Sequence, residues 1–488
     1  MDAESATPDG GAAGAVPESA APPRAVDLFA PDYRGLTAGL VTTITLIAVE
    51  SLAIGTVLPV VVRELGDQPL YGWVYTAFYL GNMLGIVLVG AALDRVPIRR
   101  PFTVGLVLYA AGLLVAGLAP SMPVLIAARF VQGSGGGSLT PTSYVAIGRR
   151  LPSRLQPPMF ALMSAAWVLP GLIGPSIAAF IGAVAGWRWV FLALLPLLAV
   201  AGAVSLRALR SVPGPRRGDG DPAQQAMRRR MPAALLALLG AGLVIAALTA
   251  PEAAVVIGGA AIGLALLLPA FRRLTPRGTL TVREGVPAAV LLRGAMTFAF
   301  FAADGYVALL LQTWRGTSPV LTGIVFTITT VAWSGATWVQ ARHIDLVGVV
   351  PFTRLGFALV AIGALVSIAA VAPAMPPEIL VVTWALPGVG MGVMYSAATL
   401  VVLRRSRPSE QGTATASLQL ADILGTALGV GVGGAIAAAG TRAGGDGLGY
   451  ALAATFVLSA LVATLGALLA GRLGDAAPAR SAGAAAVD

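Results

Sequence analysis

The sequence contains no cysteine and a single histidine, His343. Without cysteine there is no disulfide framework and no thiolate chemistry, and one histidine excludes a multi-histidine metal site. There is also no lysine, so every basic side chain is an arginine. Charged residues make up only 11% of the 488 residues, against about 25% in soluble globular proteins. This shortage of charge predicts a polytopic helical membrane protein.

Long apolar runs fill most of the chain, which is 57% hydrophobic. A membrane helix needs about 20 apolar residues, and the sequence offers fourteen stretches of that kind. They are 36–62, 71–93, 102–119, 122–148, 159–185, 187–208, 232–250, 252–271, 287–313, 319–341, 350–372, 377–402, 413–439 and 447–471. We therefore expect an all-α membrane protein with fourteen transmembrane helices.

Arginines occupy alternate linkers between these runs, and the linkers PSMP, TAPEA and VAPAMPP between them are nearly uncharged. Basic residues favour the cytoplasmic side of a membrane. A count of fourteen spans puts every basic linker on that side, which predicts a multi-pass protein of the plasma (inner) membrane with both termini cytoplasmic. The same rule explains the net charge of +10 without a nucleic-acid partner.

The longest interior linker, 209–231, separates six spans from a two-span hairpin and six more. Two pseudo-symmetric six-helix bundles with an inserted hairpin are a plan typical of secondary transporters. The segment before the first span lacks the basic start and apolar core of a signal peptide. The expected parts are a disordered tail 1–33, a bundle 34–208, a cytoplasmic loop 209–231, the hairpin 232–271, a cytoplasmic loop 272–286, a bundle 287–471 and a disordered tail 472–488.

The charged residues inside predicted spans include Glu50, Arg129, Asp304 and Asp422. A charge at mid-membrane costs about 2.5–3.5 kcal/mol on insertion scales, so each needs a reason. One reading is structural, a satisfied interior charge that holds helices together. The other is a site that gains and loses a proton during transport, and these four are our candidates for proton coupling. From depth alone, Arg129 is predicted to pair with Glu50.

Glycines gather in ARFVQGSGGGSLTPTS, residues 128–143. The run lacks the G-K-[ST] of a phosphate-binding loop and lies within a predicted span, so ATP binding is rejected. Gly133, Gly136 and Gly137 instead predict close helix approach. A second stretch, WVLPGLIGPSIAAFIG at 167–182, has two prolines in one span. It is either a packing kink or a hinge between bundles.

The tight loop GAALDRVPIRR, residues 90–100, places an acid and arginines at one membrane face. It is either an ordinary basic loop or a latch that holds one state through charge pairs and helix-end dipoles. Three aromatic residues, Tyr79, Trp333 and Tyr395, are candidates for a cargo cavity. Lipid-facing packing is the alternative for each of them.

Taken together, these stretches resemble the major facilitator superfamily, most closely its fourteen-span drug:proton antiporter branch, over residues 35–475. Glu50 stands nine residues before Pro59, which is the spacing of the family's first-span acid. The fourth-span pattern R-x-x-Q-G is similar to Arg129, Gln132 and Gly133. The resemblance implies that this arginine takes part in proton coupling.

Two more family patterns are matched with departures. The cytoplasmic latch pattern is similar to Gly90, Asp94, Arg95 and Arg99, but Pro97 and Ile98 replace an expected glycine and a basic residue. The antiporter pattern is similar to the stretch holding Gly171, Gly174 and Pro175, with alanines for its last glycines. This second match implies antiport, and hence export, over symport.

The resulting hypothesis is a proton-coupled, alternating-access exporter of small amphipathic molecules or drugs, with the proton as coupling ion and no other cofactor or metal. The expected partners are this cargo and the lipid bilayer, and the protein is expected to be a monomer. An exporter or flippase of a specific endogenous lipid or metabolite is the first alternative. A membrane-embedded enzyme or sensor is disfavoured because no nucleophile–base pair or metal cluster is recognisable, and a channel because paired halves with kinked spans favour alternating access.

Overall fold

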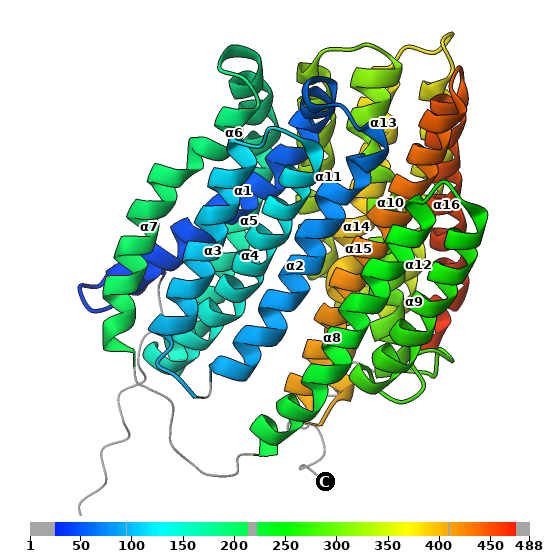
Figure 1. The fold of residues 1–488 in the computed structure, drawn as a ribbon. Coiled ribbons are helices and arrows are strands. Elements are labelled where there is room, and N and C mark those ends of the chain that lie inside the picture. The colour runs from blue at the N-terminus through cyan, green and yellow to red at the C-terminus, as the bar shows by residue number, and fades with distance from the viewer. Residues whose placement is uncertain (1–24, 94, 213–221, 408–409, 475–488) are drawn as a thin grey trace, which may run out of the picture.

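The computed structural model describes residues 25–93, 95–212, 222–407 and 410–474, and in these ranges it is helical without strands (Figure 1). The helices are α1 (Arg34–Leu65), α2 (Tyr71–Ala92), α3 (Arg99–Gly117), α4 (Met122–Arg150), α5 (Gln156–Val184), α6 (Arg188–Leu192), α7 (Leu194–Ala208), α8 (Pro222–Thr249), α9 (Ala253–Leu274), α10 (Val286–Leu309), α11 (Pro319–Val347), α12 (Val349–Ser367), α13 (Ile379–Thr383), α14 (Ala385–Arg405), α15 (Gln411–Ala443) and α16 (Gly447–Leu469). A π-helical turn, η5 (Leu310–Trp314), extends α10.

Thirteen helical segments of the described ranges are long and apolar enough to cross a membrane. The protein is therefore a multi-pass membrane protein, as the composition predicted. The predicted span 122–148 corresponds to α4, which is long enough to cross a membrane but is not in this group. It is less apolar because it carries Arg129, Gln132 and several glycines and serines. The count of fourteen spans accordingly stays a prediction.

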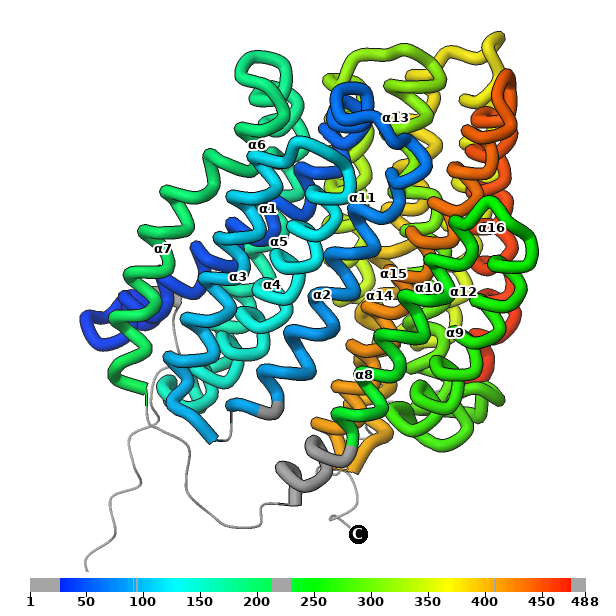
Figure 2. The backbone as a smooth tube through the Cα atoms, in the orientation of Figure 1, coloured from blue at the N-terminus to red at the C-terminus, as the bar shows by residue number. Residues whose placement is uncertain are grey.

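The helices pack in two groups that repeat one pattern (Figure 2). In the first group α1 packs on α5 and α7, while α4 packs between α2 and α3. In the second group α10 packs on α15 and α16, while α14 packs between α11 and α12. We call α1–α7 the N-terminal half and α10–α16 the C-terminal half.

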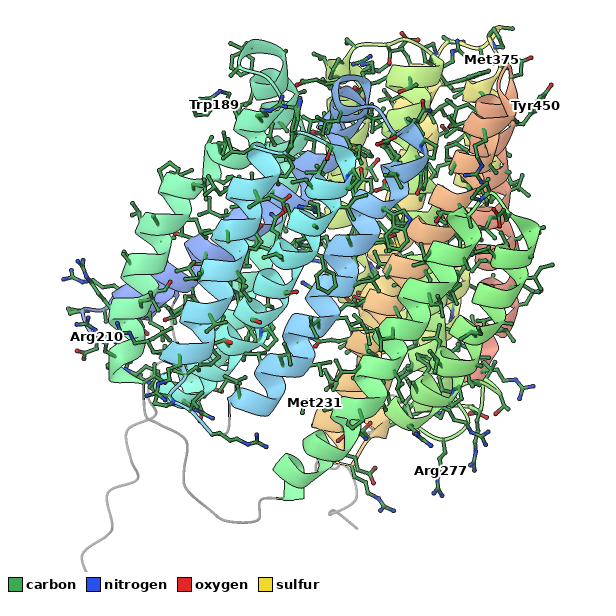
Figure 3. The ribbon with its side chains drawn as sticks, viewed as in Figure 1. Trp189, Arg210, Met231, Arg277, Met375 and Tyr450 are labelled. Carbon is green, nitrogen blue, oxygen red and sulfur yellow. The ribbon has the colours of Figure 1, made fainter. Side chains whose placement is uncertain are left out.

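The two ends of the bundle differ in charge (Figure 3). Arg210 and Arg277 lie at one end, which we call the basic end, and Trp189, Met375 and Tyr450 lie at the opposite end. The predicted loop residues Arg95 and Arg99 are exposed. Arg149 at the end of α4 donates a hydrogen bond to the Leu93 carbonyl at 3.1 Å. Asp94 of the predicted latch lies outside the described residues, so the latch stays a prediction.

Glycine sets the spacing of the helices around α4. A Cβ on Gly133 would lie 2.0 Å from the Phe78 carbonyl oxygen, and one on Gly137 would lie 2.0 Å from the Asn82 carbonyl oxygen, both on α2. The prediction of close approach is therefore confirmed at these two positions. It is wrong for Gly136, where a Cβ would lie 3.5 Å from the Tyr109 ring, because that face of α4 meets a side chain rather than backbone. The third close approach is made by Gly135, against the Tyr109 backbone of α3.

Candidate functional site

Glu50 of α1 and Arg129 of α4 form an ion pair in the interior of the N-terminal half. Each side chain is only 1% exposed. The pairing predicted from depth alone is therefore confirmed as a contact. Since an ion pair removed from water is held only where further hydrogen bonds satisfy both groups, the neighbours of this pair matter.

Three helices supply those neighbours. Tyr109 of α3 donates its hydroxyl to Glu50 Oε2 at 3.3 Å. Arg129 Nη1 also donates to Gln132 Oε1 at 2.7 Å, and its Nε donates to the Val74 carbonyl at 3.3 Å. The guanidinium carbon lies 4.3 Å from the centre of the Phe78 ring, a cation–π contact. The carboxylate is thus enclosed by one arginine and one tyrosine.

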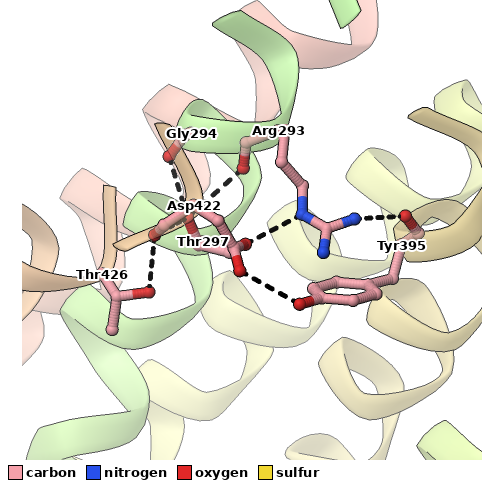
Figure 4. A network of polar contacts seen from close by, with 6 residues as sticks. All are labelled: Arg293, Gly294, Thr297, Tyr395, Asp422 and Thr426. Atoms are coloured by element: carbon pink, nitrogen blue, oxygen red, sulfur yellow. Dashed lines mark hydrogen bonds and ion pairs between the residues drawn. The ribbon is translucent and has the colours of Figure 1, made fainter. Parts of the chain in front are cut away.

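A second buried cluster lies in the C-terminal half (Figure 4). Arg293 of α10 donates from Nε to Asp422 Oδ1 of α15 at 2.8 Å. Tyr395 of α14 donates its hydroxyl to Asp422 Oδ2 at 3.0 Å. The Arg293 guanidinium also donates to the Tyr395 carbonyl and lies over its ring. Each half therefore holds one acid that pairs with an arginine and accepts a hydrogen bond from a tyrosine.

The two clusters differ in how closed they are. Arg293 is 6% exposed and Asp422 is 22% exposed, against 1% for both members of the first pair. The hydroxyls of Thr297 and Thr426 bond to the Asp422 carbonyl at 3.0 and 2.9 Å, which fixes the backbone next to the acid. The second carboxylate is thus rigidly placed but more open.

Arg293 is not among the site residues predicted from the sequence, although it lies inside the predicted span 287–313. The argument from insertion cost that singled out Glu50 applies equally to an arginine at that position. Its partner Asp422 was predicted as a site residue. The structure shows that the acid is paired, which the sequence did not reveal.

Asp304 of α10 has a different environment from the other two acids. Its Oδ1 accepts a hydrogen bond from the Trp384 indole N–H of α14 at 2.8 Å. Within the described residues, it makes no ion pair with an arginine or histidine. It is therefore the intramembrane carboxylate whose charge is left without a counter-charge.

Aromatic rings connect the two halves beside these acids. Tyr79 of α2 lies 6.4 Å from Phe301 of α10, and Phe301 lies 5.1 Å from Phe300, measured between ring centres. Phe300 lies 5.6 Å from Trp333 of α11, which lies 5.7 Å from Tyr395. The structure therefore joins the three predicted cavity aromatics in one row of five rings, and all three remain partly exposed. Their contact with cargo stays a prediction.

The antiporter-like stretch lies where α5 of one half meets α11 of the other. A Cβ on Gly171 would lie 2.2 Å from Thr330 Cγ2, and one on Gly323 of α11 would lie 3.3 Å from the Pro175 carbonyl oxygen. The Ser176 and Thr327 hydroxyls lie 3.3 Å apart. Pro175 is inside a continuous helix, and Gly174 faces α1 with its nearest neighbour 3.9 Å away.

Other contacts join the halves near the end opposite the basic one. Gly72 at the start of α2 meets Gly434 of α15 so closely that a Cβ on Gly72 would lie 2.7 Å from the Gly434 Cα. Gln312 in the π-helical turn donates to the Thr56 carbonyl of α1 at 2.8 Å. A π-turn often marks a functional position in a helix, and here Gln312 inside the turn reaches across to the other half.

The sequence of residues 39–373 matches the family model of the Major Facilitator Superfamily. The chain belongs to this family of transporters, in keeping with its two repeated groups of membrane helices.

Individual relatives agree with the family. A probable multidrug-efflux transporter of Mycobacterium tuberculosis is 27% identical over 429 residues, covering 85% of this chain and 89% of that protein. A multidrug transporter protein of Bacillus subtilis is 29% identical over 166 residues, covering 34% of this chain and 31% of that protein.

Solved structures share the fold at low identity. A bacterial homologue of the human lysosomal transporter Spinster, in an inward-facing and unoccupied conformation, superposes with a TM-score of 0.64 at 15% identity, covering 91% of this chain and 98% of that one. An auto-inhibited peptide transporter of the POT family gives 0.66 at 15% identity, with 89% and 97% covered.

Proposed function

We propose that this protein is a proton-coupled exporter of small amphipathic molecules that works by alternating access as an antiporter. It carries fourteen spans, with α4 as the remaining one, and the basic end and both termini face the cytoplasm in the plasma (inner) membrane. It acts as a monomer. Multidrug efflux is the activity named for the relatives in Mycobacterium tuberculosis and Bacillus subtilis, and it supports export of drug-like cargo here.

The observation that carries proton coupling is the enclosed pair of Glu50 and Arg129. A proton on Glu50 cancels the carboxylate charge and leaves Arg129 charged in a site where its side chain is only 1% exposed. The arginine then gains by moving to another partner or toward solvent, because an unpaired buried charge is unstable. Proton uptake is in this way coupled to a change in the contacts between α1 and α4.

The arrangement of the halves supports an inward-facing state. Gly72 meets Gly434, and Gln312 reaches Thr56, near the end opposite the basic one. Under the positive-inside rule the basic end is cytoplasmic, so these contacts form the closed outer side. Export then requires them to separate so that cargo leaves outward.

The acid without a counter-charge suggests the class of cargo. Asp304 lies next to Trp384, and Trp384 stacks on Phe300 at 5.8 Å in the aromatic row. A carboxylate beside a group of aromatic rings suits a planar cation, because carboxylates and ring faces both attract positive charge. We therefore assign cationic amphipathic molecules as the preferred cargo.

The driving force limits this exchange. A membrane potential of 100 mV supplies about 2.3 kcal/mol per charge, and each pH unit adds about 1.4 kcal/mol. A neutral cargo exchanged for one proton uses both terms and reaches a gradient of a few hundred-fold, on the order of 10 per 1.4 kcal/mol. A monovalent cation exchanged for one proton moves no net charge, so it uses the pH difference alone.

The test is accumulation of the cationic dye ethidium in pump-deficient cells, with and without a protonophore. Cells with the natural protein should keep dye low only when energised, and Glu50→Gln should accumulate dye like empty vector. The matched control is Glu64→Gln, because Glu64 lies on the same helix but is 50% exposed in its pair with Arg188. This control should export normally.

Equal export by Glu50→Gln would reject the role of Glu50 as the proton carrier and move it to Asp304 or Asp422. A folded natural protein that exports no dye, energised or not, would reject multidrug export. That result would favour the alternative of a specific endogenous lipid or metabolite.

A further inference from the structure

The hairpin of α8 and α9 lies along the joint between α2 of the N-terminal half and α15 of the C-terminal half (Figure 2). The face of α8 toward this joint is made of small residues: Ala233, Ala237 and Ala241 are 5%, 0% and 0% exposed. They form one apolar cluster with side chains of both halves. These side chains are Leu80 and Met83 on α2, and Leu424 and Ala427 on α15.

Polar contacts fasten the hairpin to α15 toward both ends of that helix. Near the basic end, Ser417 donates its hydroxyl to the Leu274 carbonyl of α9 at 2.9 Å. Near the opposite end, Arg442 donates to the Thr249 carbonyl at the end of α8 at 3.1 Å. Between them Gly431 lies so close to α8 that a Cβ there would be 2.7 Å from Ile245. The hairpin is thus fixed along the length of α15.

The contact with α2 is of another kind. Its polar part is a bond from the Trp73 indole N–H to the Thr249 hydroxyl at 3.2 Å, near the end opposite the basic one. Along the rest, a Cβ on Gly242 would meet Leu80 at 3.5 Å, which is ordinary van der Waals contact. Apolar surfaces in ordinary contact can shift past one another without breaking hydrogen bonds. Among the described residues, the Trp73 bond is the polar contact between α2 and the hairpin that resists such a shift.

We propose that the α8–α9 hairpin is a fixed side wall of the C-terminal half, and that α2 moves against it when the transporter changes state. The inference rests on the proposed alternating access. It assigns the hairpin to the half that follows it in the chain, and it makes the bond between Trp73 and Thr249 a tie that holds the inward-facing state. When α2 and α15 separate at that end, this bond breaks and the bond from Arg442 stays.

The test is to measure distances between pairs of spin labels by electron paramagnetic resonance. The chain has no cysteine, so each introduced cysteine is labelled alone without altering other positions. Leu118→Cys reports on the N-terminal half, Val255→Cys on the hairpin and Tyr450→Cys on the C-terminal half. These side chains are 61%, 47% and 74% exposed. Tyr450 lies at the end opposite the basic one (Figure 3). Leu118 directly follows α3, which starts at the basic loop, and Val255 is in the first turn of α9, which follows the end of α8 at Thr249.

A bulky substitution at the joint between α5 and α11, which we call the wedge, is used to drive the change of state. The Gly171→Leu substitution places a side chain where even a Cβ lies 2.2 Å from Thr330, so it pushes α5 from α11 without touching the hairpin. The matched control is Gly335→Leu on α11, where nothing lies within 4 Å. If the wedged protein does not fold, Gln312→Ala, which removes the bond to Thr56, opens the same end more gently.

In the wedged protein we expect the distances from Leu118 to Tyr450 and from Leu118 to Val255 to lengthen together. The distance from Val255 to Tyr450 should keep a single unchanged peak. A hairpin label that follows Leu118 instead would overturn the assignment while leaving alternating access in place. An unchanged distance from Leu118 to Tyr450, in both Gly171→Leu and Gln312→Ala, would overturn the hairpin assignment and alternating access together.

Discussion

Replacing Glu50 by glutamine keeps the shape of the side chain and removes its charge. Arg129 would then remain charged at 1% exposure with no counter-charge. The amide oxygen of the new side chain can still accept one hydrogen bond from the guanidinium. The substitution therefore isolates the value of the carboxylate charge in the enclosed pair.

The magnitude follows from what is left around Arg129. Breaking a buried pair by removing one partner costs about 3–5 kcal/mol. Gln132, the Val74 carbonyl and the Phe78 ring continue to stabilise the cation, so the lower end, about 3 kcal/mol, is expected. Replacing both members, as Glu50→Gln with Arg129→Gln, removes both charges. The double variant should therefore be more stable than the sum of single losses predicts, by about 2 kcal/mol.

The measurement is a double-mutant cycle on the free energy of unfolding of the purified protein in bicelles, at one fixed pH. Glu64→Gln is the control, because exposed pairs contribute about 0–1 kcal/mol. Losses for Glu50→Gln and Arg129→Gln that add within about 0.5 kcal/mol would refute the reasoning. So would a loss for Glu50→Gln no larger than that of the control.

Three further predictions rest on the same contacts. Asp422→Asn should lower the free energy of unfolding by about 1–3 kcal/mol. This is less than the loss for Glu50→Gln, because Asp422 is 22% exposed. Equal losses for the two variants in the same unfolding assay would contradict this. Gly133→Ala should destabilise the protein by about 1–3 kcal/mol, because the new Cβ would lie 2.0 Å from the Phe78 carbonyl oxygen. Gly136→Ala should be nearly neutral, because its Cβ would lie 3.5 Å from the nearest atom. Similar unfolding curves for the two variants would show that the packing argument fails. Asp304→Asn should reduce export of a cationic dye more than export of a neutral one of similar size, and equal reductions would remove the role of this acid in cargo choice.

Much of the architecture could be predicted from the sequence because membrane insertion imposes simple rules. Length and apolarity predicted the multi-pass helical fold, and depth within the spans predicted the contact of Glu50 with Arg129. The helix α4, predicted as the span 122–148, is less apolar than the other spans because its arginine and most of its glycines are buried against neighbouring helices.

The distinctions among the acids could not be predicted, because they depend on helices far apart in sequence. Asp422 meets Arg293 and Tyr395, whereas Asp304 meets an indole N–H from Trp384. The same limit explains why the prediction of close helix approach is wrong for Gly136. Which glycine faces a backbone and which faces a ring depends on the neighbouring helix, and the repeat of glycines in one run carries no such information.

The two joints between the halves face lipid differently. The alanine face of α8 covers the one between α2 and α15. At the joint between α5 and α11, Ile173, Ile177 and Ile324 are 45%, 44% and 43% exposed, beside the paired hydroxyls of Ser176 and Thr327. Molecules dissolved in the bilayer therefore meet the exposed outer side chains of the hairpin, Leu239, Ile257 and Ile262, on one flank. On the other flank they meet exposed isoleucines beside paired hydroxyls. The molecule is thus asymmetric in the plane of the membrane: one joint between the halves is covered by an extra pair of helices, and the other is exposed along its length.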